Sequence, residues 1–387
     1  MMFDFFSVPR ICFGPGKIAV LGDLLQPLGP RVLVVYNGGD SALAKVRDRT
    51  AAAGVATTVH RQKGEPTVAD IDAGLNVARV DGCTGVIGVG GGSAIDAAKA
   101  IAGLLTNGGT ALDYMEVIGA GKKITQPAAP WIAIPTTAGT GAEVTRNAVV
   151  GEPSKQFKAS IRSELLLPRV ALVDPELGVG VPADVTAASG MDALCQCIEA
   201  YLSTGASPLT DALALKGVEL AWSALPLAVA DGTDIAARSD MALAALISGV
   251  CLTNAGLGAV HGFAAPTGAN YPVPHGVVCA ALLPHVLKAN ASVAAAKGNS
   301  VTRLKCIVLG GIIALQTDRP AEELHLAAAD AVLDLNQKLR IPQLSTYGIK
   351  EGAVESMVSL ARKASSMKFN PVLLSDQTLQ DILRSAL

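Results

Sequence analysis

The chain has 387 residues, of which 50% are hydrophobic and 17% are charged, against about 25% charged residues in an average globular protein. This composition predicts a large buried core and excludes a disordered chain, and the length predicts two or three domains. The formal net charge is −2 and no long basic run occurs, so we expect no nucleic-acid partner.

A membrane span is not expected from the most conspicuous apolar stretch, Thr84–Leu105. This stretch contains Asp96, Lys99 and a run of glycines, a pattern that predicts a buried strand, a turn and a packed helix. The N-terminus lacks the basic-then-apolar plan of a signal peptide. We therefore expect a cytoplasmic protein without a membrane partner.

The first half of the chain alternates strand-like and helix-like segments. Short apolar runs rich in β-branched residues predict strands, and longer amphipathic runs between them predict helices. The predicted strands cover residues 31–37, 55–60, 84–90, 131–137 and 169–175, and the predicted helices cover 41–54, 68–82 and a segment from Ser93. This order is typical of a mostly parallel, doubly wound (Rossmann-like) α/β sheet.

Helical patterns replace the strands after about Pro182. The clearest helical segments are 207–232 and 234–256, which are rich in alanine and leucine. We place the domain boundary near Val179–Ala183. The sequence thus predicts an α/β domain over residues 1–180 and an all-helical domain over 181–387.

A glycine-rich turn between a predicted strand and a predicted helix is the first candidate binding site. Gly91 and Gly92 precede Ser93, where glycines and the first N–H groups of a helix can bind phosphate. The segment fits the GxGxxG fingerprint only loosely. The alternative interpretation is a tight turn with Ser93 as the helix cap.

A second candidate segment follows the predicted strand at 131–137. Thr136, Thr137 and Thr140 lie in a turn of small residues, where hydroxyl groups suit a ligand at the carboxyl end of a sheet. Lys155 and Lys158 follow and could reach a phosphate or a ribose. The alternative is a threonine-rich connecting loop with ordinary surface lysines.

A third candidate site combines histidines with a carboxylate. The segment between His261 and His275 is rich in Gly, Pro and Asn and predicts a helix broken by a loop, with a histidine at each margin. Together with Asp192, these imidazoles form a common ligand set for Zn²⁺ or Fe²⁺. A lone histidine is more often structural, so the spacing alone leaves this site as a hypothesis.

The seven cysteines are expected to be reduced, buried thiols without a metal role. Their number is odd and no CxxC pair occurs. Cys195 and Cys197 stand two positions apart on a predicted helix, so their side chains point in nearly opposite directions.

These segments together resemble the group III, iron-containing alcohol dehydrogenase family almost from end to end. The resemblance is carried by PRICFGPGKIAVL, GGGSAIDAAKA, PTTAGTGAEVTRNAVV, TAASGMDALCQCIEAYLS, AVHGFAAPTGANYPVPHGVVCAALLPHVLKAN and FNPVLLSDQTLQDILRSAL. It implies the dehydroquinate-synthase-like fold of that family, with a dinucleotide-binding domain, a helical domain and a metal. It also implies a homo-oligomer, a dimer or larger.

The resemblance implies a ligand set for the metal at Asp192, His261 and His275, which are also the expected catalytic residues. A further family histidine corresponds to Gln196, and an active-site histidine corresponds to Ala265. Three alternatives follow. Asp192 and the two histidines suffice, or Gln196 completes a weaker four-ligand site, or no metal binds and His261, His275 and Gln196 contact the substrate oxygen directly.

The resemblance also implies cofactor contacts within its two cofactor motifs, at Gly91, Gly92, Ser93, Asp96, Thr136, Thr137, Thr140 and Asn147, with Lys158 nearby. In the family pattern an aspartate often follows the second strand, and Asn37 stands at that place. A carboxylate there repels the 2′-phosphate of NADP, whereas an amide does not. The cofactor is therefore expected to be NAD or NADP, with a slight preference for NAD.

The predicted function is hydride transfer between NAD(P) and an alcohol, aldehyde or ketone, with Fe²⁺ or Zn²⁺ polarising the substrate oxygen. Because Ala265 is smaller than histidine, we expect tolerance of a larger carbonyl substrate. The alternatives are a maleylacetate-reductase-like enzyme, a non-redox enzyme on the dehydroquinate-synthase-like scaffold, and a cofactor-binding protein without metal-dependent activity.

Overall fold

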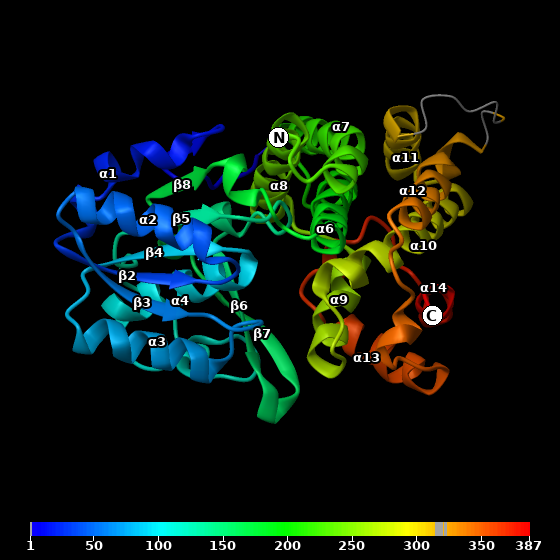
Figure 1. Cartoon of the computed structure of the whole chain (residues 1–387). Helices are drawn as coiled ribbons and strands as arrows, with labels where there is room; N and C mark the ends of the chain where they lie inside the picture. Colours follow the sequence, from blue (N-terminus) through cyan, green and yellow to red (C-terminus); the bar gives the residue numbers. More distant parts are fainter. Residues whose placement is uncertain (1, 314–319, 321–322) are drawn as a thin grey trace. The chain divides into compact units, whose positions relative to one another are not determined.

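The computed structural model describes residues 2–313, 320 and 323–387 of the chain. The chain divides into a unit of Phe5–Val181 and a unit of Pro182–Leu387 that also includes Met1–Asp4. In the described residues, every strand of the structure belongs to the first of these units, and the second is helical (Figure 1).

A six-stranded, fully parallel sheet forms the centre of the α/β unit. Its strands lie in the order β1-β8-β5-β4-β2-β3. The strands are β1 (Ile11–Phe13), β2 (Arg31–Tyr36), β3 (Ala56–Arg61), β4 (Gly85–Gly90), β5 (Trp131–Pro135) and β8 (Val170–Val173). The predicted doubly wound sheet is therefore confirmed, and each predicted strand overlaps an observed one.

Helices cover both faces of this sheet because successive residues of a strand point to opposite sides. In β2, Val32 and Val34 join one apolar core, whereas Leu33 and Val35 join the other. All four are completely buried, as expected for a parallel strand covered on two sides. The helices of this unit are α1 (Leu21–Leu24), α2 (Asp40–Ala52), α3 (Val68–Val80), α4 (Gly92–Asn107) and α5 (Ala111–Tyr114).

The strand order reverses between β2 and β4. The chain passes from β2 outward to the edge strand β3, and it then returns to place β4 on the other side of β2. At such a reversal the two following loops diverge and leave a crevice at the carboxyl ends of the strands, where open α/β sheets bind ligands. Asn37 follows β2 and Gly91 follows β4, so both lie at this switch point.

A two-stranded antiparallel hairpin, β6 (Asn147–Glu152) and β7 (Phe157–Arg162), interrupts the α/β alternation. This hairpin was not predicted from the sequence. A short 3₁₀ turn, Pro153–Lys155, joins the two strands, and Glu152 accepts a hydrogen bond from the backbone N–H of Ser154. Only some residues of these strands are buried, so they lack the continuous apolar run that identifies the central strands.

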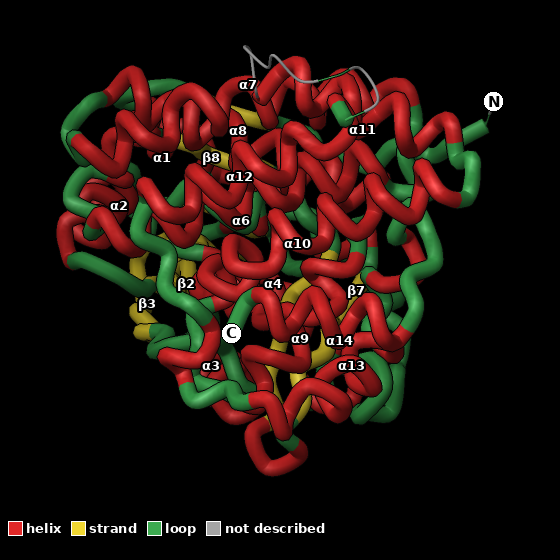
Figure 2. The backbone as a smooth tube through the Cα atoms, turned by 90° about the vertical axis from the view of Figure 1, so that its right-hand side faces the viewer, coloured by secondary structure: helices red, strands yellow, loops and turns green. Residues whose placement is uncertain are grey.

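In its described residues, the second unit consists of helices joined by loops and 3₁₀ turns (Figure 2). The predicted all-helical character is confirmed for the described residues, and the predicted helical segments 207–232 and 234–256 correspond to α7 and α8. The helices are α6 (Ala183–Leu202), α7 (Pro208–Ala230), α8 (Ile235–Ala255), α9 (Ala259–Asn270), α10 (His275–Ala296), α11 (Ser300–Ile313), α12 (Ala327–Lys338), α13 (Val354–Lys363) and α14 (Asp376–Ser385).

Within the described residues, α7, α8 and α10 are long and apolar enough in composition to cross a membrane. These helices were not expected from the sequence, where Thr84–Leu105 is the most conspicuous apolar stretch. In this structure α10 packs against α6, α9, α11, α12 and α14, and 67% of its most apolar window is buried. Its composition is therefore that of a central helix of the bundle, since a helix that is apolar all round needs neighbours on every side.

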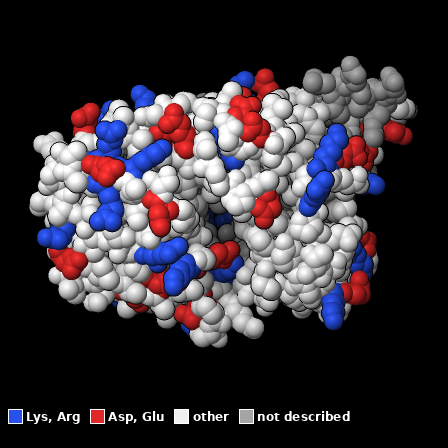
Figure 3. Space-filling model, in the orientation of Figure 1, with Lys and Arg blue, Asp and Glu red and all other residues white. Residues whose placement is uncertain are grey.

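Acidic and basic side chains are interspersed on the face of the molecule shown in Figure 3. Neither sign gathers into a large patch on that face, in keeping with the net charge of −2. A surface that binds nucleic acid needs a basic stripe or patch, and this face has none among the described residues.

Candidate active site

At the switch point of the sheet, the loop after β2 and the loop after β4 are joined by a hydrogen bond. The side chain of Asn37 accepts a hydrogen bond from the backbone N–H of Gly91 through Oδ1, at 2.8 Å. Asn37 comes immediately after β2, and Gly91 precedes the first residue of α4. The amide of Asn37 therefore fixes the conformation of the glycine turn as well as standing at the position expected to select the cofactor.

The glycines of this turn are required by their surroundings. Gly90 has φ of +140°, and a Cβ there would lie 2.0 Å from Oδ1 of Asn37. A Cβ on Gly92 would lie 2.7 Å from Oγ1 of Thr140, and one on Gly91 would lie 3.3 Å from Oγ1 of Thr137. The loop after β5 thus packs directly onto the glycine turn, so the two predicted cofactor segments meet in space.

The N-terminus of α4 is available to an anionic ligand. Its N-cap is Gly91, and among the described residues no side chain caps this helix. Ser93 is therefore not the cap, in contrast to the alternative interpretation of the sequence, and lies in the first helical turn. The first N–H groups of a helix have no intrahelical acceptor, and together with the helix dipole they suit a phosphate.

The other predicted cofactor residues have partners of their own. The backbone N–H of Thr136 donates to Gly90, at 2.9 Å, and extends the pairing of β5 with β4. Asp96 accepts from Lys99 at 3.2 Å and from the backbone N–H of Val149 at 3.0 Å. Burial raises the pKa of Asp96, although Lys99 opposes this effect. Asp96 therefore joins α4 to the hairpin.

Asn147 and Lys158 belong to the hairpin. The backbone carbonyl of Asn147 accepts a hydrogen bond from the buried ammonium of Lys99, at 2.6 Å. Lys158 on β7 forms an ion pair with Glu65, and Lys155 donates to the carbonyl of Ile118. In this arrangement neither lysine has an unpaired ammonium group.

The second candidate site lies in the helical unit, where α10 approaches α6 closely. A Cβ on Gly276 would lie 2.2 Å from the carbonyl oxygen of Ala188, so only glycine permits this approach. The contact brings His275, the first residue of α10, to Asp192 on α6: Nε2 of His275 lies 3.7 Å from Oδ1 of Asp192. The side chain of His275 is 38% exposed, whereas Asp192 is buried.

His261 is held at the start of α9 by two residues distant in sequence. The carboxylate of Glu199 accepts from the backbone N–H of Val260 at 2.7 Å and from that of His261 at 3.3 Å. Asn370 accepts from the N–H of the first residue of α9, at 3.1 Å. A Cβ on Gly258 would lie 2.8 Å from Glu199 and 2.9 Å from Asn370. This cap fixes the first helical turn and hence the imidazole.

The imidazole of His261 bridges two carboxylates. Its Nδ1 lies 2.7 Å from Oε2 of Glu199, and its Nε2 lies 3.2 Å from Oδ1 of Asp192. Because Glu199 accepts at Nδ1, the proton of a neutral ring resides there and the lone pair of Nε2 faces the cluster. Such a carboxylate–histidine pair orients the ring and makes it a stronger ligand when it binds a metal.

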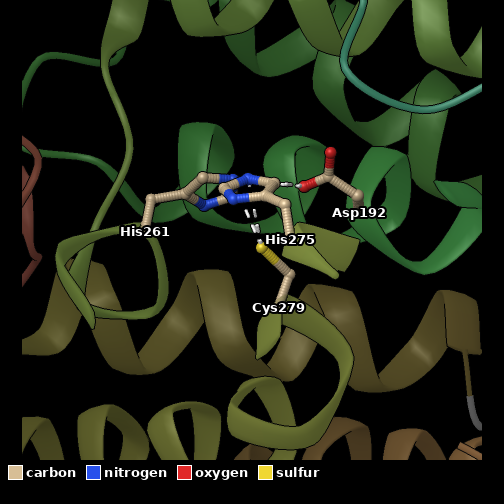
Figure 4. A group of neighbouring side chains, drawn as sticks. All are labelled: Asp192, His261, His275 and Cys279. Carbon is tan, nitrogen blue, oxygen red and sulfur yellow. Dashed lines mark hydrogen bonds and ion pairs between the residues drawn. The ribbon is translucent and has the colours of Figure 1, made fainter. Parts of the chain in front are cut away.

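Four donor atoms converge at this point (Figure 4). The side chains of Asp192, His261, His275 and Cys279 offer one atom each, and all four lie within 4.8 Å of one another. The two imidazole rings are 5.4 Å apart between centroids and tilted by 56°. Carboxylate, imidazole and thiolate are the donors that zinc and iron take in proteins, so the residues present fit a divalent metal.

The neighbouring side chains shift the pKa values of Asp192, His261 and His275 toward their charged forms. Burial alone would raise the pKa of Asp192, but His275 and His261 outweigh it and bring the pKa below its ordinary value. Burial likewise opposes the charged form of His261, yet Cys279 and Asp192 hold the pKa of this imidazole well above its usual range. The pKa of His275 is raised to about 9 by the same two neighbours, against the effect of burial. The surroundings of Asp192 therefore favour a positive charge beside its carboxylate.

Gln196 contacts the outer oxygen of Asp192. Its Nε2 donates to Oδ2 at 3.3 Å, while its Oε1 accepts from the hydroxyl of Ser248 at 3.5 Å. The amide oxygen, which is the only atom of this side chain that could ligate a metal, is thus directed to Ser248 on α8. Gln196 lies next to the cluster, with its donor group facing Asp192.

All seven cysteines are buried and none forms a disulfide. As helix geometry predicts, Cys195 and Cys197 face different neighbours: the sulfur of Cys195 lies 4.0 Å from Nδ1 of His261, and that of Cys197 lies 3.9 Å from the carbonyl of Ala244. Cys279 was not considered as a ligand in the sequence analysis, although its sulfur lies 3.6 Å from Nε2 of each histidine.

The segment between the two histidines is more regular than the sequence suggests. The predicted loop is wrong for most of this segment, because α9 continues through Pro266 to Asn270 and only residues 271–274 form a loop. Ala265 stands one turn after His261, on the same side of the helix. A histidine at this position would stand on the same side of α9 as His261, and the residue there has only a methyl group.

Two residues of the site escaped the sequence analysis, Glu199 and Cys279. Glu199 stands seven residues after Asp192, and Cys279 stands four residues after His275. Both spacings place the pairs on one face of a helix. Helical spacing counted from the predicted ligands could therefore have identified both.

Comparisons with known proteins agree on one family for the whole chain. The profile described as "Iron-containing alcohol dehydrogenase" matches residues 9–175, and that of "Fe-containing alcohol dehydrogenase family, C-terminal" matches residues 186–387. The 1,3-propanediol dehydrogenase of Klebsiella pneumoniae is 36% identical over 100% of this chain and 99% of its own length.

Two further matches also span both chains. The NAD-dependent methanol dehydrogenase of Bacillus methanolicus is 34% identical over 100% of each chain. A crystal structure of 1,3-propanediol oxidoreductase superimposes with a TM-score of 0.91, at 34% identity and with 100% of each chain covered. The agreement therefore includes both units.

Proposed function

Because the chain belongs to the iron-containing alcohol dehydrogenase family, we propose that Asp192, His261 and His275 hold its divalent metal beside the substrate oxygen. The family assignment makes the protein an oxidoreductase that interconverts alcohols with aldehydes or ketones using a nicotinamide cofactor. The predicted family, fold and enzyme class are thereby confirmed.

The observation that carries the metal assignment is the convergence of both imidazole Nε2 atoms on the same oxygen of Asp192, at 3.2 and 3.7 Å. When bound, a divalent metal supplies Lewis-acid polarisation of the substrate oxygen. Glu199 keeps the proton of His261 on Nδ1, at 2.7 Å, and so keeps the lone pair of Nε2 directed at the cluster. His275, the most exposed of the three ligands, forms the solvent-facing side of the cluster.

We assign the cofactor to the turn between β4 and α4. When bound, the nicotinamide supplies the hydride or accepts it. The uncapped first turn of α4 suits the diphosphate of the cofactor, and the glycine turn admits it without steric conflict from side chains. Thr137 and Thr140 pack against Gly91 and Gly92 and present hydroxyl groups at the same place. Asp96 and Asn147 support this turn through Lys99.

We further propose that NAD is preferred over NADP, because the NAD-dependent methanol dehydrogenase of Bacillus methanolicus is 34% identical to this chain over its whole length. The margin is modest, because no charged side chain stands where the cofactor would be selected. Asn37 at the end of β2 directs its oxygen to Gly91, at 2.8 Å, and carries no charge to repel a 2′-phosphate. Replacing Asn37 with Asp should keep the acceptor for Gly91 and add that charge. We expect the ratio of kcat/KM with NADH to kcat/KM with NADPH to rise about tenfold, which is about 1.4 kcal/mol.

Asn37→Ala is the comparison for this experiment. Alanine removes the acceptor for the Gly91 N–H, so it should weaken the binding of both cofactors to a similar extent. The ratio of kcat/KM with NADH to kcat/KM with NADPH should then stay nearly unchanged. An unchanged ratio in Asn37→Asp would show that this side chain does not face the cofactor ribose.

The proposed function is tested by removing and restoring the metal. Full-length protein is assayed for oxidation of NADH and NADPH with aldehydes of increasing length, before and after dialysis against a chelator. We expect turnover with aldehydes, its loss after chelation, and its recovery on addition of Zn²⁺ or Fe²⁺. Cofactor binding without metal and without turnover would contradict the proposal, and activity that survives complete removal of metal would contradict the metal's role.

We also propose a cytoplasmic homo-oligomer. The support for an oligomer is the apolar surface of α7. Only 39% of the most apolar 18-residue stretch of this helix is buried, and Leu227 on it is 56% exposed. Exposed apolar side chains on one helix favour contact with another copy of the chain. Light scattering after size-exclusion chromatography tests this, and a monomer at micromolar concentration would contradict it.

A further inference from the structure

Cys279 is one of the four residues whose donor atoms converge at the proposed metal site, and it was not among the ligands predicted from the sequence. We propose that its thiolate is a protein ligand of the metal, together with Asp192, His261 and His275, and that Gln196 is not a ligand. This inference rests on the proposed function, which supplies the metal. Binding releases the thiol proton to solvent, and the sulfur then donates an electron pair to the ion.

The distances between the donor atoms support a single ion among them. The sulfur of Cys279 lies 3.6 Å from Nε2 of His261 and 3.6 Å from Nε2 of His275. Oδ1 of Asp192 lies 3.2 and 3.7 Å from the same two nitrogens. A tetrahedral ion held at about 2.0–2.1 Å by nitrogen and about 2.3 Å by sulfur separates such atoms by about 3.3–3.6 Å. The observed separations differ from this range by 0.1 Å or less.

The position of Cys279 is set by the same helix that carries His275. The two residues stand four apart at the start of α10, so both side chains lie on one face of its first turns. Cys279 is completely buried, and Gly276 brings this end of α10 against the backbone of α6 at Ala188. The thiol is thus presented to Asp192 by the contact that positions His275.

Gln196 has a different task in this arrangement. Its Nε2 donates to Oδ2 of Asp192 at 3.3 Å, and its oxygen faces Ser248. Gln196 therefore occupies the oxygen of Asp192 that points away from the imidazoles. It leaves Oδ1 as the ligand atom and acts as a positioning residue.

Cys195 is the rival thiol, since its sulfur lies 4.0 Å from Nδ1 of His261. That nitrogen is already 2.7 Å from the carboxylate of Glu199, so Cys195 lies beside the Nδ1 edge of the ring, whereas Asp192 lies beside Nε2. The thiol of Cys195 is also hydrogen-bonded to that of Cys279, and a serine hydroxyl can keep this contact. Cys195 and Cys279 are both buried thiols beside one histidine, which makes Cys195→Ser a matched control. A thiolate in the set also favours zinc over the harder divalent ions.

The test uses cobalt(II) as a spectroscopic substitute for the metal. Metal-free, full-length wild type, Cys279→Ser and Cys195→Ser are titrated with Co²⁺, and the near-ultraviolet band of sulfur-to-cobalt charge transfer is recorded. We expect the band in wild type and in Cys195→Ser and its loss in Cys279→Ser. The dissociation constant for Zn²⁺ should rise at least about tenfold in Cys279→Ser.

The outcomes separate this inference from the proposed function. A wild type that binds cobalt without the band, a band that persists in Cys279→Ser, or a band lost in Cys195→Ser would overturn the role of Cys279 and leave the metal site standing. A wild type that binds neither cobalt nor zinc would overturn the metal site itself. If the variants do not fold, X-ray absorption spectroscopy of zinc-loaded wild type tests the same point. A sulfur atom in the zinc coordination shell is expected, and its absence would overturn the role of Cys279.

Discussion

Asp192→Asn is expected to lower kcat/KM for aldehyde reduction by about 10³-fold, because the several kcal/mol of stabilisation that a metal supplies correspond to this factor. Both imidazoles lie nearest to one oxygen of this carboxylate, at 3.2 and 3.7 Å. An amide has a similar shape but no charge, and it is a poorer ligand for zinc or iron. The loss should appear in kcat as well as in kcat/KM, since the missing interaction acts on the reacting oxygen.

The matched control for this prediction is Asp184→Asn, in the first turn of the same helix, where the side chain is exposed. It makes the same chemical change on α6 without touching the cluster, and its activity should equal that of wild type within about twofold. Circular dichroism checks that both variants keep the fold. An Asp192→Asn enzyme with more than a tenth of wild-type kcat/KM would remove Asp192 from the catalytic residues.

Glu199→Gln is expected to weaken metal binding about 10- to 100-fold, the range found for residues that orient a metal ligand. Both oxygens of Glu199 accept hydrogen bonds, one from the N–H of Val260 and the other from the ring and the N–H of His261. A glutamine side chain has one oxygen that accepts and one NH₂ group that donates. In either orientation, its NH₂ group therefore faces an N–H group of Val260 or His261 that needs an acceptor. If its NH₂ group faces Nδ1, the ring proton moves to Nε2, where it blocks the metal.

Competition with a chromophoric chelator measures the zinc dissociation constant of this variant. Glu219→Gln on α7 is the control, because this glutamate is exposed and pairs with Lys216 at the surface. Thermal unfolding of the metal-free proteins separates an effect on the ligand from a general loss of stability. An unchanged dissociation constant in Glu199→Gln would show that the Nδ1 contact does not orient His261.

Much of the architecture follows from local patterns in the chain. Continuous apolar runs such as that of β2 identify buried parallel strands, and alanine- and leucine-rich runs identify the helical unit. The hairpin of β6 and β7 was missed because its strands are only partly buried, so their pattern does not differ from that of a loop. The extent of α9 was missed because Pro266 and two glycines obscure its helical signal, while the cap by Glu199 and Asn370 comes from elsewhere in the chain.

The chemistry of the site was less accessible from the sequence. Asp192, His261 and His275 were identified by their residue types and by the resemblance, and the structure brings them together. Cys279 was grouped with the other buried thiols because its neighbours in sequence are apolar. Its neighbours in space, two imidazoles and a carboxylate, depend on the approach of α10 to α6 at Gly276. A contact between helices that are distant in the chain leaves no local pattern.

The most direct test of this account is the metal content of full-length protein purified without chelator, measured by mass spectrometry for wild type and Asp192→Asn side by side. The account predicts about one zinc or iron ion per wild-type chain, as for a single catalytic site. It predicts at least about tenfold less in the variant. Equal metal contents in the two proteins, or none in wild type, would contradict a metal site at Asp192.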